Sequence, residues 1–118
     1  MPPDLPELTR RLIAFRDDRD WRRFHNLKDL MASVAIEAAE LLELAQWKSV
    51  DELEAAAKDA RFRRRLGEEC ADVLLYLLLV CERAGIDLAQ AAASKIDGNA
   101  IRYPVAKSRG SATKYTEL

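Results

Sequence analysis

Two pairs of acidic residues stand inside apolar stretches of this sequence at the same spacing. Glu37 and Glu40 interrupt the run VAIEAAELL, and Glu69 and Asp72 interrupt the run GEECADVLLYLLL. Residues three apart lie on one face of a helix, about 5 to 6 Å from each other, so each pair directs two carboxylates at one region. We therefore expect all four acids to be partly buried and to act together.

The four acids predict a metal site if the two helices that carry them are antiparallel neighbours. Partly desolvated carboxylates repel one another or take up protons, and a divalent cation removes that penalty. Ligation by oxygen alone favours Mg²⁺, with Mn²⁺ as a substitute, over zinc or copper. A di-iron bundle needs Glu-x-x-His pairs, whereas His25, the only histidine, lies outside both pairs.

A second interpretation of the acids needs no metal. Glutamates and aspartates on helix faces commonly pair with nearby arginines, and this sequence has many arginines. The acids would then form interhelical salt bridges in a non-catalytic oligomeric helical interaction module. Magnesium separates the two interpretations, because only a metal site predicts stabilisation by Mg²⁺.

The composition favours one all-α domain. The chain has 118 residues, a size typical of a single domain, and carries 19 Lys plus Arg against 20 Asp plus Glu. This balance argues against nucleic-acid binding, and the short basic run at residues 63 to 65 is typical of a solvated helix face. Only 4 Gly and 4 Pro interrupt a sequence rich in Ala and Leu, which indicates helices.

Neither a membrane segment nor a disulfide is expected. The longest apolar run, residues 73 to 81, is shorter than the roughly 20 residues that a membrane-spanning helix needs. The first residues lack the pattern of a signal peptide, so we expect a cytoplasmic protein. Cys70 and Cys81 lie on one expected helix, about 16 Å apart along its axis, which predicts two reduced, buried thiols.

Caps and apolar periodicity predict the helices of a four-helix bundle. The first helix covers residues 7 to 18, and Asn26 caps a second that runs to about residue 48. Ser49 and Glu52 form a capping box that opens a short helix to about residue 58. A long helix over residues 61 to 84 ends at Gly85, and Asp87 caps a last one that stops before residue 104.

These helices form a domain over residues 1 to 104, followed by a polar C-terminal tail over residues 105 to 118. The tail shows no helical pattern, which predicts a segment that is mobile or is ordered by a ligand or partner. Beyond Asp72 the helix over residues 61 to 84 is apolar on every side, more than a bundle of this size can cover. We therefore expect an oligomer.

Longer motifs around the acids resemble one known family. The chain resembles the MazG-like nucleoside triphosphate pyrophosphohydrolases, in particular their dCTP pyrophosphatase branch. The segments that carry the resemblance are FRDDRDWRRFHN, EAAELLELAQWK, EECADVLLYLL, GIDLAQAAASKIDGNAIRYP and KYTEL. The similarity extends from about Leu8 to the C-terminus. It implies the all-α fold of the NTP pyrophosphatase type and a homodimer or homotetramer whose sites are shared between subunits.

The resemblance also implies a reaction. Members hydrolyse a nucleoside triphosphate, here dCTP or a modified dCTP, to the monophosphate and pyrophosphate, a house-cleaning reaction of the nucleotide pool. Glu37, Glu40, Glu69 and Asp72 stand at the family's magnesium-ligand positions. Glu37 and Glu40 are also the catalytic candidates, because one of them would take the proton of the attacking water. Leu12 replaces a histidine that eukaryotic members carry near the base, so the base preference does not follow from the reaction alone.

Seven residues are candidates for substrate binding. Two aromatic positions match residues that pack around the nucleobase, two more match other pocket positions, two basic positions suit the triphosphate, and His25 is the seventh candidate. The set is Trp21, His25, Trp47, Tyr76, Lys95, Asn99 and Arg102. Other interpretations exist for several of them: Trp47 suits a helical core, His25 suits local capping, and Lys95 and Arg102 suit solvated charges on the last helix. Trp21, in a charged connection, is the better candidate for a stacking platform.

Overall fold

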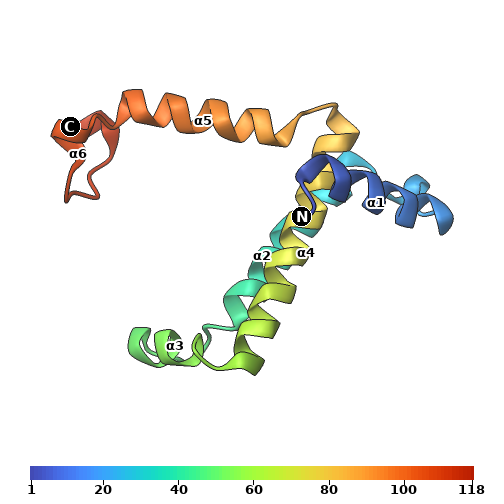
Figure 1. Ribbon diagram of the computed structural model, residues 1–118, viewed down its shortest axis with the longest axis horizontal. Coiled ribbons are helices and arrows are strands. Elements are labelled where there is room, and N and C mark those ends of the chain that lie inside the picture. The colour runs from blue at the N-terminus through green and yellow to red at the C-terminus, as the bar shows by residue number, and fades with distance from the viewer. The chain divides into compact units, whose positions relative to one another are not determined.

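The structure, a computed structural model, describes residues 1–118 and contains only helices and turns (Figure 1). The α-helices are α1 (Leu5–Asp18), α2 (Leu27–Glu43), α3 (Val50–Ala56), α4 (Ala60–Ala84), α5 (Leu88–Arg102) and α6 (Val105–Ser108). Two 3₁₀ turns, η1 (Arg22–Phe24) and η2 (Tyr115–Glu117), complete the secondary structure. The all-α class is confirmed. The chain forms two compact units, Met1–Gly85 and Ile86–Leu118.

The predicted caps begin and end the helices. The Asn26 side chain accepts a hydrogen bond from the backbone N–H of Asp29 at 2.8 Å. Ser49 and Glu52 form the reciprocal capping box, with bonds of 3.1 and 3.4 Å. Gly85 ends α4 in the left-handed region, with φ 71°, where a residue without Cβ is favoured. Local sequence therefore accounts for where α2, α3 and α5 begin and where α4 ends.

Two segments differ from the prediction. α2 ends at Glu43 rather than near residue 48, because the N–H groups of residues 44 to 46 bond to the carbonyl three residues back. Trp47 then adopts a positive φ of 65°, which is rare for a residue with a side chain and turns the backbone. After Pro104, where the sequence shows no helical pattern, the structure contains α6 and η2. A separate role for residues 105 to 118 stays a prediction.

The core of the first unit lies where α4 packs against α2 and α1. α2 and α4 run side by side in opposite directions (Figure 1). The buried apolar residues are Leu30, Leu44, Leu78, Leu79 and Cys81. Both cysteines are free, but Cys70 is exposed, so the prediction of two buried thiols is wrong for that residue. Cys70 lies on a side of α4 that no element of the chain covers.

A buried ion pair joins α1 to α4. Arg16 is only 4% exposed, and its Nη1 donates to Oε2 of Glu82 at 3.0 Å. Its Nε donates to Oδ1 of the neighbouring Asp17 at 2.9 Å. Because the guanidinium is desolvated, removing either partner would leave an uncompensated charge. The pair therefore fixes the end of α1 against the last turns of α4.

Large apolar side chains remain exposed on α2. They include Met31, Ile36 and Leu42, the last of them 70% exposed. A single chain buries few residues completely, and exposed apolar surface of this kind is typical of protein interfaces. This supports the expected oligomer, which stays a prediction. As for membranes, no helix of the chain combines the length and the apolar character that crossing a bilayer requires.

Candidate metal and nucleotide site

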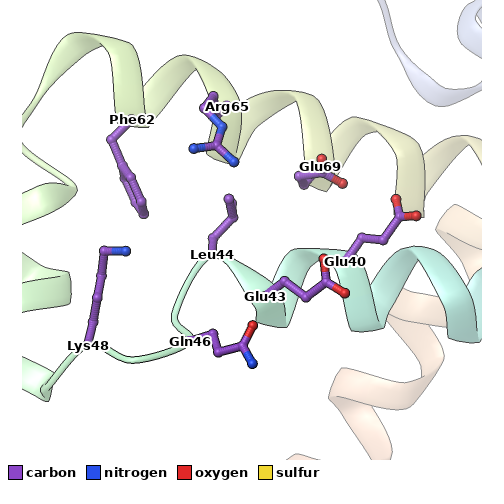
Figure 2. A pocket seen from close by; sticks show the side chains of 8 residues that line it. All are labelled: Glu40, Glu43, Leu44, Gln46, Lys48, Phe62, Arg65 and Glu69. Atoms are coloured by element: carbon purple, nitrogen blue, oxygen red, sulfur yellow. The ribbon is translucent and has the colours of Figure 1, made fainter.

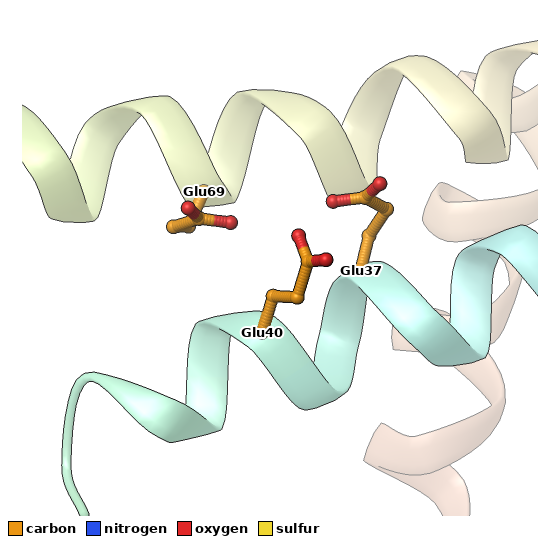
Figure 3. Close-up of side chains that lie close together, drawn as sticks. All are labelled: Glu37, Glu40 and Glu69. Atoms are coloured by element: carbon orange, nitrogen blue, oxygen red, sulfur yellow. The ribbon is translucent and has the colours of Figure 1, made fainter.

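The structure brings together three of the four predicted acids. Glu37 and Glu40 extend from α2 and Glu69 from α4, into the space between the two helices (Figure 3). One carboxylate oxygen of each residue lies within 4.8 Å of those of the other two. The antiparallel pairing of α2 with α4 produces this convergence, because it sets the inward face of each helix against the other.

Negative charge in this cluster is not compensated within the chain. Oε2 of Glu37 and Oε2 of Glu69 are buried and have no hydrogen-bond partner. The pKa of Glu37 is raised above its ordinary value, first by a hydrogen bond with Glu40, then by desolvation. The negative charges of Glu40, Asp72 and Glu69 raise the pKa of Glu37 further. Carboxylate oxygens thus converge, two of them buried without a donor, and such a set suits a hard divalent cation.

The salt bridges expected from the second interpretation are not formed. The ion pairs of the structure join Arg16 to Asp17, Arg16 to Glu82, and Arg23 to Asp20. None of the four predicted acids takes part in one. The prediction that arginines form salt bridges with these acids is therefore wrong within the single chain.

Asp72 differs from the other three acids. It is exposed and does not belong to the cluster of three carboxylates, although its charge contributes to the raised pKa of Glu37. Glu37 and Glu69 are half-buried, whereas Glu40 is exposed like Asp72. The prediction that all four acids are partly buried is thus wrong for Glu40 and Asp72. One side of the α2–α4 pair is left open to solvent at these positions.

A cavity of about 340 Å³ extends from the carboxylates along α2 and α4 (Figure 2). Its lining residues are Glu40, Glu43, Leu44, Gln46, Lys48, Phe62, Arg65 and Glu69. Lys48 and Arg65 place positive charges beside the acids, a combination suited to phosphate groups near a cation. Neither residue was predicted: the run that contains Arg65 was assigned to a solvated face, and position 48 was considered only as the end of the second helix. The signal was available, since Arg65 precedes Glu69 by one helical turn.

A second cavity, of about 190 Å³, lies between α1, the following connection and α4. Its lining residues are Leu12, Phe15, Arg16, Trp21, His25, Asp72, Leu75, Tyr76 and Leu79. Three predicted substrate residues therefore meet here, together with Asp72. The Trp21 ring packs edge-on against Phe15 with centroids 5.8 Å apart, and Nδ1 of His25 is buried without a partner. Aromatic walls with an unpaired polar atom suit a flat heterocycle.

The structure does not bring Trp47 to either cavity. Its side chain is 91% exposed, so the prediction that it packs in a helical core is wrong. The early end of α2 is the reason, because Trp47 stands in the turn after the helix and no longer on its inward face. A fully exposed indole is expected to have a partner outside its own chain.

The second unit carries the remaining candidates on one helix. Lys95, Asn99 and Arg102 occupy a common face of α5 at helical spacing, and all three are exposed. The guanidinium of Arg102 lies 5.1 Å from the centre of the Tyr115 ring, which also packs against Tyr103. η2 is thus held against the end of α5 by aromatic contacts.

An all-helical fold with converging carboxylates between antiparallel helices defines a candidate metal-dependent site, and comparison with known proteins places the chain more closely. The chain belongs to the MazG-like family, whose model matches residues 32–118. It is 45% identical to dCTP pyrophosphatase 1 of Mus musculus over 116 residues, 98% of this chain and 68% of that protein. The Homo sapiens dCTP pyrophosphatase 1 is 40% identical, with the same coverage of both chains.

A solved structure supports the same fold. The crystal structure of a pyrophosphatase from Archaeoglobus fulgidus DSM 4304 matches with a TM-score of 0.79 and 40% sequence identity. The match covers 88% of this chain and 95% of that chain. The family predicted from the motifs is therefore confirmed, together with its all-α fold.

Proposed function

We propose that the protein is a cytoplasmic, Mg²⁺-dependent pyrophosphohydrolase that converts dCTP or a modified dCTP to the monophosphate and pyrophosphate. One observation carries the proposal: carboxylate oxygens of Glu37, Glu40 and Glu69 lie within 4.8 Å of one another beside a cavity with basic side chains. The identity to proteins named dCTP pyrophosphatase 1 supports the substrate. The role would be house-cleaning of the nucleotide pool.

The residues present fit a hard cation. Glu37, Glu40 and Glu69 would hold Mg²⁺, or Mn²⁺ in its place, since two of their oxygens are buried without a hydrogen-bond donor. Asp72, one turn after Glu69, would complete the set of four. When bound, the cation neutralises phosphate oxygens and activates water as the nucleophile. Glu37 or Glu40 would accept the proton of that water.

The chain's own charges would orient the triphosphate. Lys48 and Arg65 lie at the cavity beside the acids, where each could donate to a phosphate oxygen. Lys95 and Arg102 on α5 are further candidates for the same task. Basic groups that hold the β and γ phosphates stabilise the pyrophosphate that leaves, so they would favour cleavage between the α and β phosphates.

The nucleobase would enter the cavity lined by Trp21 and Tyr76. Stacking on an indole tolerates any base, because every base has a π-face, so the other lining groups must select among bases. His25, with its unpaired Nδ1, is one such group. Asn99 on α5 is another candidate. Trp47 of a neighbouring subunit would complete the site in a homodimer or homotetramer, which would explain its exposure.

Product analysis tests this function. The purified protein is incubated with canonical and 5-modified dNTPs, with Mg²⁺ or with EDTA, and the products are separated. We expect monophosphate and pyrophosphate in equal amounts, only with Mg²⁺, and fastest from a cytosine nucleotide. Faster turnover of another base would overturn the substrate and keep the reaction. No turnover of any nucleotide would overturn the function and favour a helical interaction module.

A further inference from the structure

A buried positive charge borders the cavity assigned to the nucleobase. Arg16 on α1 lines this cavity together with Trp21 and Tyr76, yet it is only 4% exposed. The remaining lining residues are mostly aromatic or apolar, such as Leu12 and Leu75, and they also include Asp72. Burial of a charge needs compensation, and Glu82 and Asp17 supply it through one hydrogen bond each. These bonds hold the guanidinium in one orientation.

The two bonds leave part of the guanidinium unused. Nε donates to Asp17 and Nη1 donates to Glu82, whereas Nη2 makes no hydrogen bond in the chain. A guanidinium carries five N–H donors, has no acceptor, and stays protonated in proteins. Arg16 therefore offers free, permanently charged donors at a site with aromatic and apolar walls. A triphosphate does not match these walls, but the polar edge of a base does.

We infer that Arg16 is a specificity-determining residue that donates a hydrogen bond to a carbonyl oxygen of the nucleobase. This inference rests on the proposed function. A group that only donates favours bases with a carbonyl oxygen, which are cytosine, thymine, uracil and guanine, over adenine, whose acceptors are ring nitrogens alone. Glu82 and Asp17 act as positioning residues, because they fix the fork and neutralise its charge.

A hydrogen bond from Arg16 would make a site that only stacks bases selective among them. Trp21 and Tyr76 fix the plane of the base without reading its edge. A buried charged donor that finds no acceptor where it points is costly, so a base that lacks a carbonyl oxygen at that position is rejected more strongly than loss of one hydrogen bond implies.

The test compares variants that remove the donor but keep the fold. Arg16→Met alone would leave Glu82 without its partner, so the main variant is Arg16→Met with Glu82→Leu, which removes both charges. Arg16→Lys is the second variant, because it keeps a charge for Glu82 and loses the fork. Arg19→Met is the matched control, since Arg19 is exposed on the same part of the chain and stacks on Phe15 at 3.7 Å.

Steady-state kinetics with dCTP, dTTP, dGTP and dATP, calorimetric binding of dCMP and dAMP, and melting temperatures are measured for each protein. We expect kcat/KM for dCTP to fall roughly 10- to 100-fold in the double variant, mainly through KM. Turnover of dATP should change little, so the preference for carbonyl bases collapses. Arg16→Lys should show the same trend with a smaller change, and Arg19→Met should retain the preference.

Several results would overturn the inference. One is an equal loss for all four nucleotides in variants that melt normally, because Arg16 would then only hold α1 in place. Another is an unchanged preference in both variants, and a third is equal use of dATP and dCTP by the unmodified protein. If the unmodified protein neither turns over a dNTP nor binds dCMP, the proposed function itself fails, which is a separate outcome. If the double variant does not fold, Arg16→Lys decides.

Discussion

A carboxylate oxygen of Glu37 on α2 lies within 4.8 Å of a carboxylate oxygen of Glu69 on α4. Each of the two residues also has a buried Oε2 that receives no hydrogen bond. The negative charges of these two carboxylates are close together and partly removed from water, so their repulsion opposes the packing of α2 against α4. A divalent cation between the carboxylates would convert this repulsion into attraction.

Glu69→Gln should abolish stabilisation by metal. The unmodified chain is expected to melt at a higher temperature in Mg²⁺ than in EDTA, because a ligand that binds only the folded state stabilises it. In the variant this increase should disappear, turnover should fall on the order of 100-fold, and stability in EDTA should not decrease, since repulsion is relieved. Glu68→Gln, one residue earlier and exposed, is the control. An unchanged response to Mg²⁺ in Glu69→Gln would exclude Glu69 as a ligand.

Stability of the metal-free chain should depend on pH through Glu37. The pKa of this carboxyl in the folded chain lies above its ordinary value of 4.5. Between these two values the folded chain binds more protons than the unfolded chain, so stability falls as pH rises through this window. Denaturant titrations in EDTA from pH 4 upward measure the effect. In Glu37→Gln the same window should show a flatter profile, and an identical profile would contradict the assignment.

Mg²⁺ should counteract that loss, because protons and the cation compete for the same oxygens. The increase in melting temperature caused by Mg²⁺ is therefore expected to be larger above the window than below it. Scanning calorimetry at fixed Mg²⁺ and varied pH measures it. An increase that is equally large in acid would place the cation elsewhere.

Trp21→Ala should weaken nucleotide binding and leave the fold intact. Stacking of a base on an aromatic ring contributes about 1 to 3 kcal/mol, so KM is expected to rise roughly 5- to 150-fold. The melting temperature should change little, because the indole is 44% exposed and its aromatic contact is with Phe15 alone. Phe24→Ala, an exposed aromatic in the same segment that lines neither cavity, is the control. Normal KM with a large loss of stability would make Trp21 a structural residue.

Trp47 should act on the site of a neighbouring subunit. Glu40→Gln and Trp47→Ala are each expected to be nearly inactive alone. When the two proteins are mixed and allowed to exchange subunits, half of the dimers are mixed and each mixed dimer contains one complete site. Activity should then recover to about a quarter of the unmodified level. Mixing without recovery, despite exchange shown by mass spectrometry, would place Trp47 in the site of its own chain or outside any site.

Local sequence determined the elements and their chemistry. Side chains such as Asn26, Ser49 and Asp87 bond to backbone groups only three residues away, so their caps could be read without knowledge of the rest of the fold. Gly85 at the end of α4 follows from the same kind of reasoning. The spacing of each acidic pair is likewise a property of one helix, and the surrounding motifs identified the family.

Only the tertiary structure decided which side chains meet. Glu37, Glu40 and Glu69 form the cluster and Asp72 does not, because the rotation and stagger of α2 against α4 decide which oxygens approach. The same packing brings Lys48 and Arg65 beside the acids, whereas the packing of α1 against α4 buries Arg16 in the cavity that Trp21 also lines. The periodicity of a sequence shows which residues share a face of one helix. It does not show how two helices are rotated and shifted against each other where they pack. The sequence therefore specified the ligands, and the packing of helices specified the site.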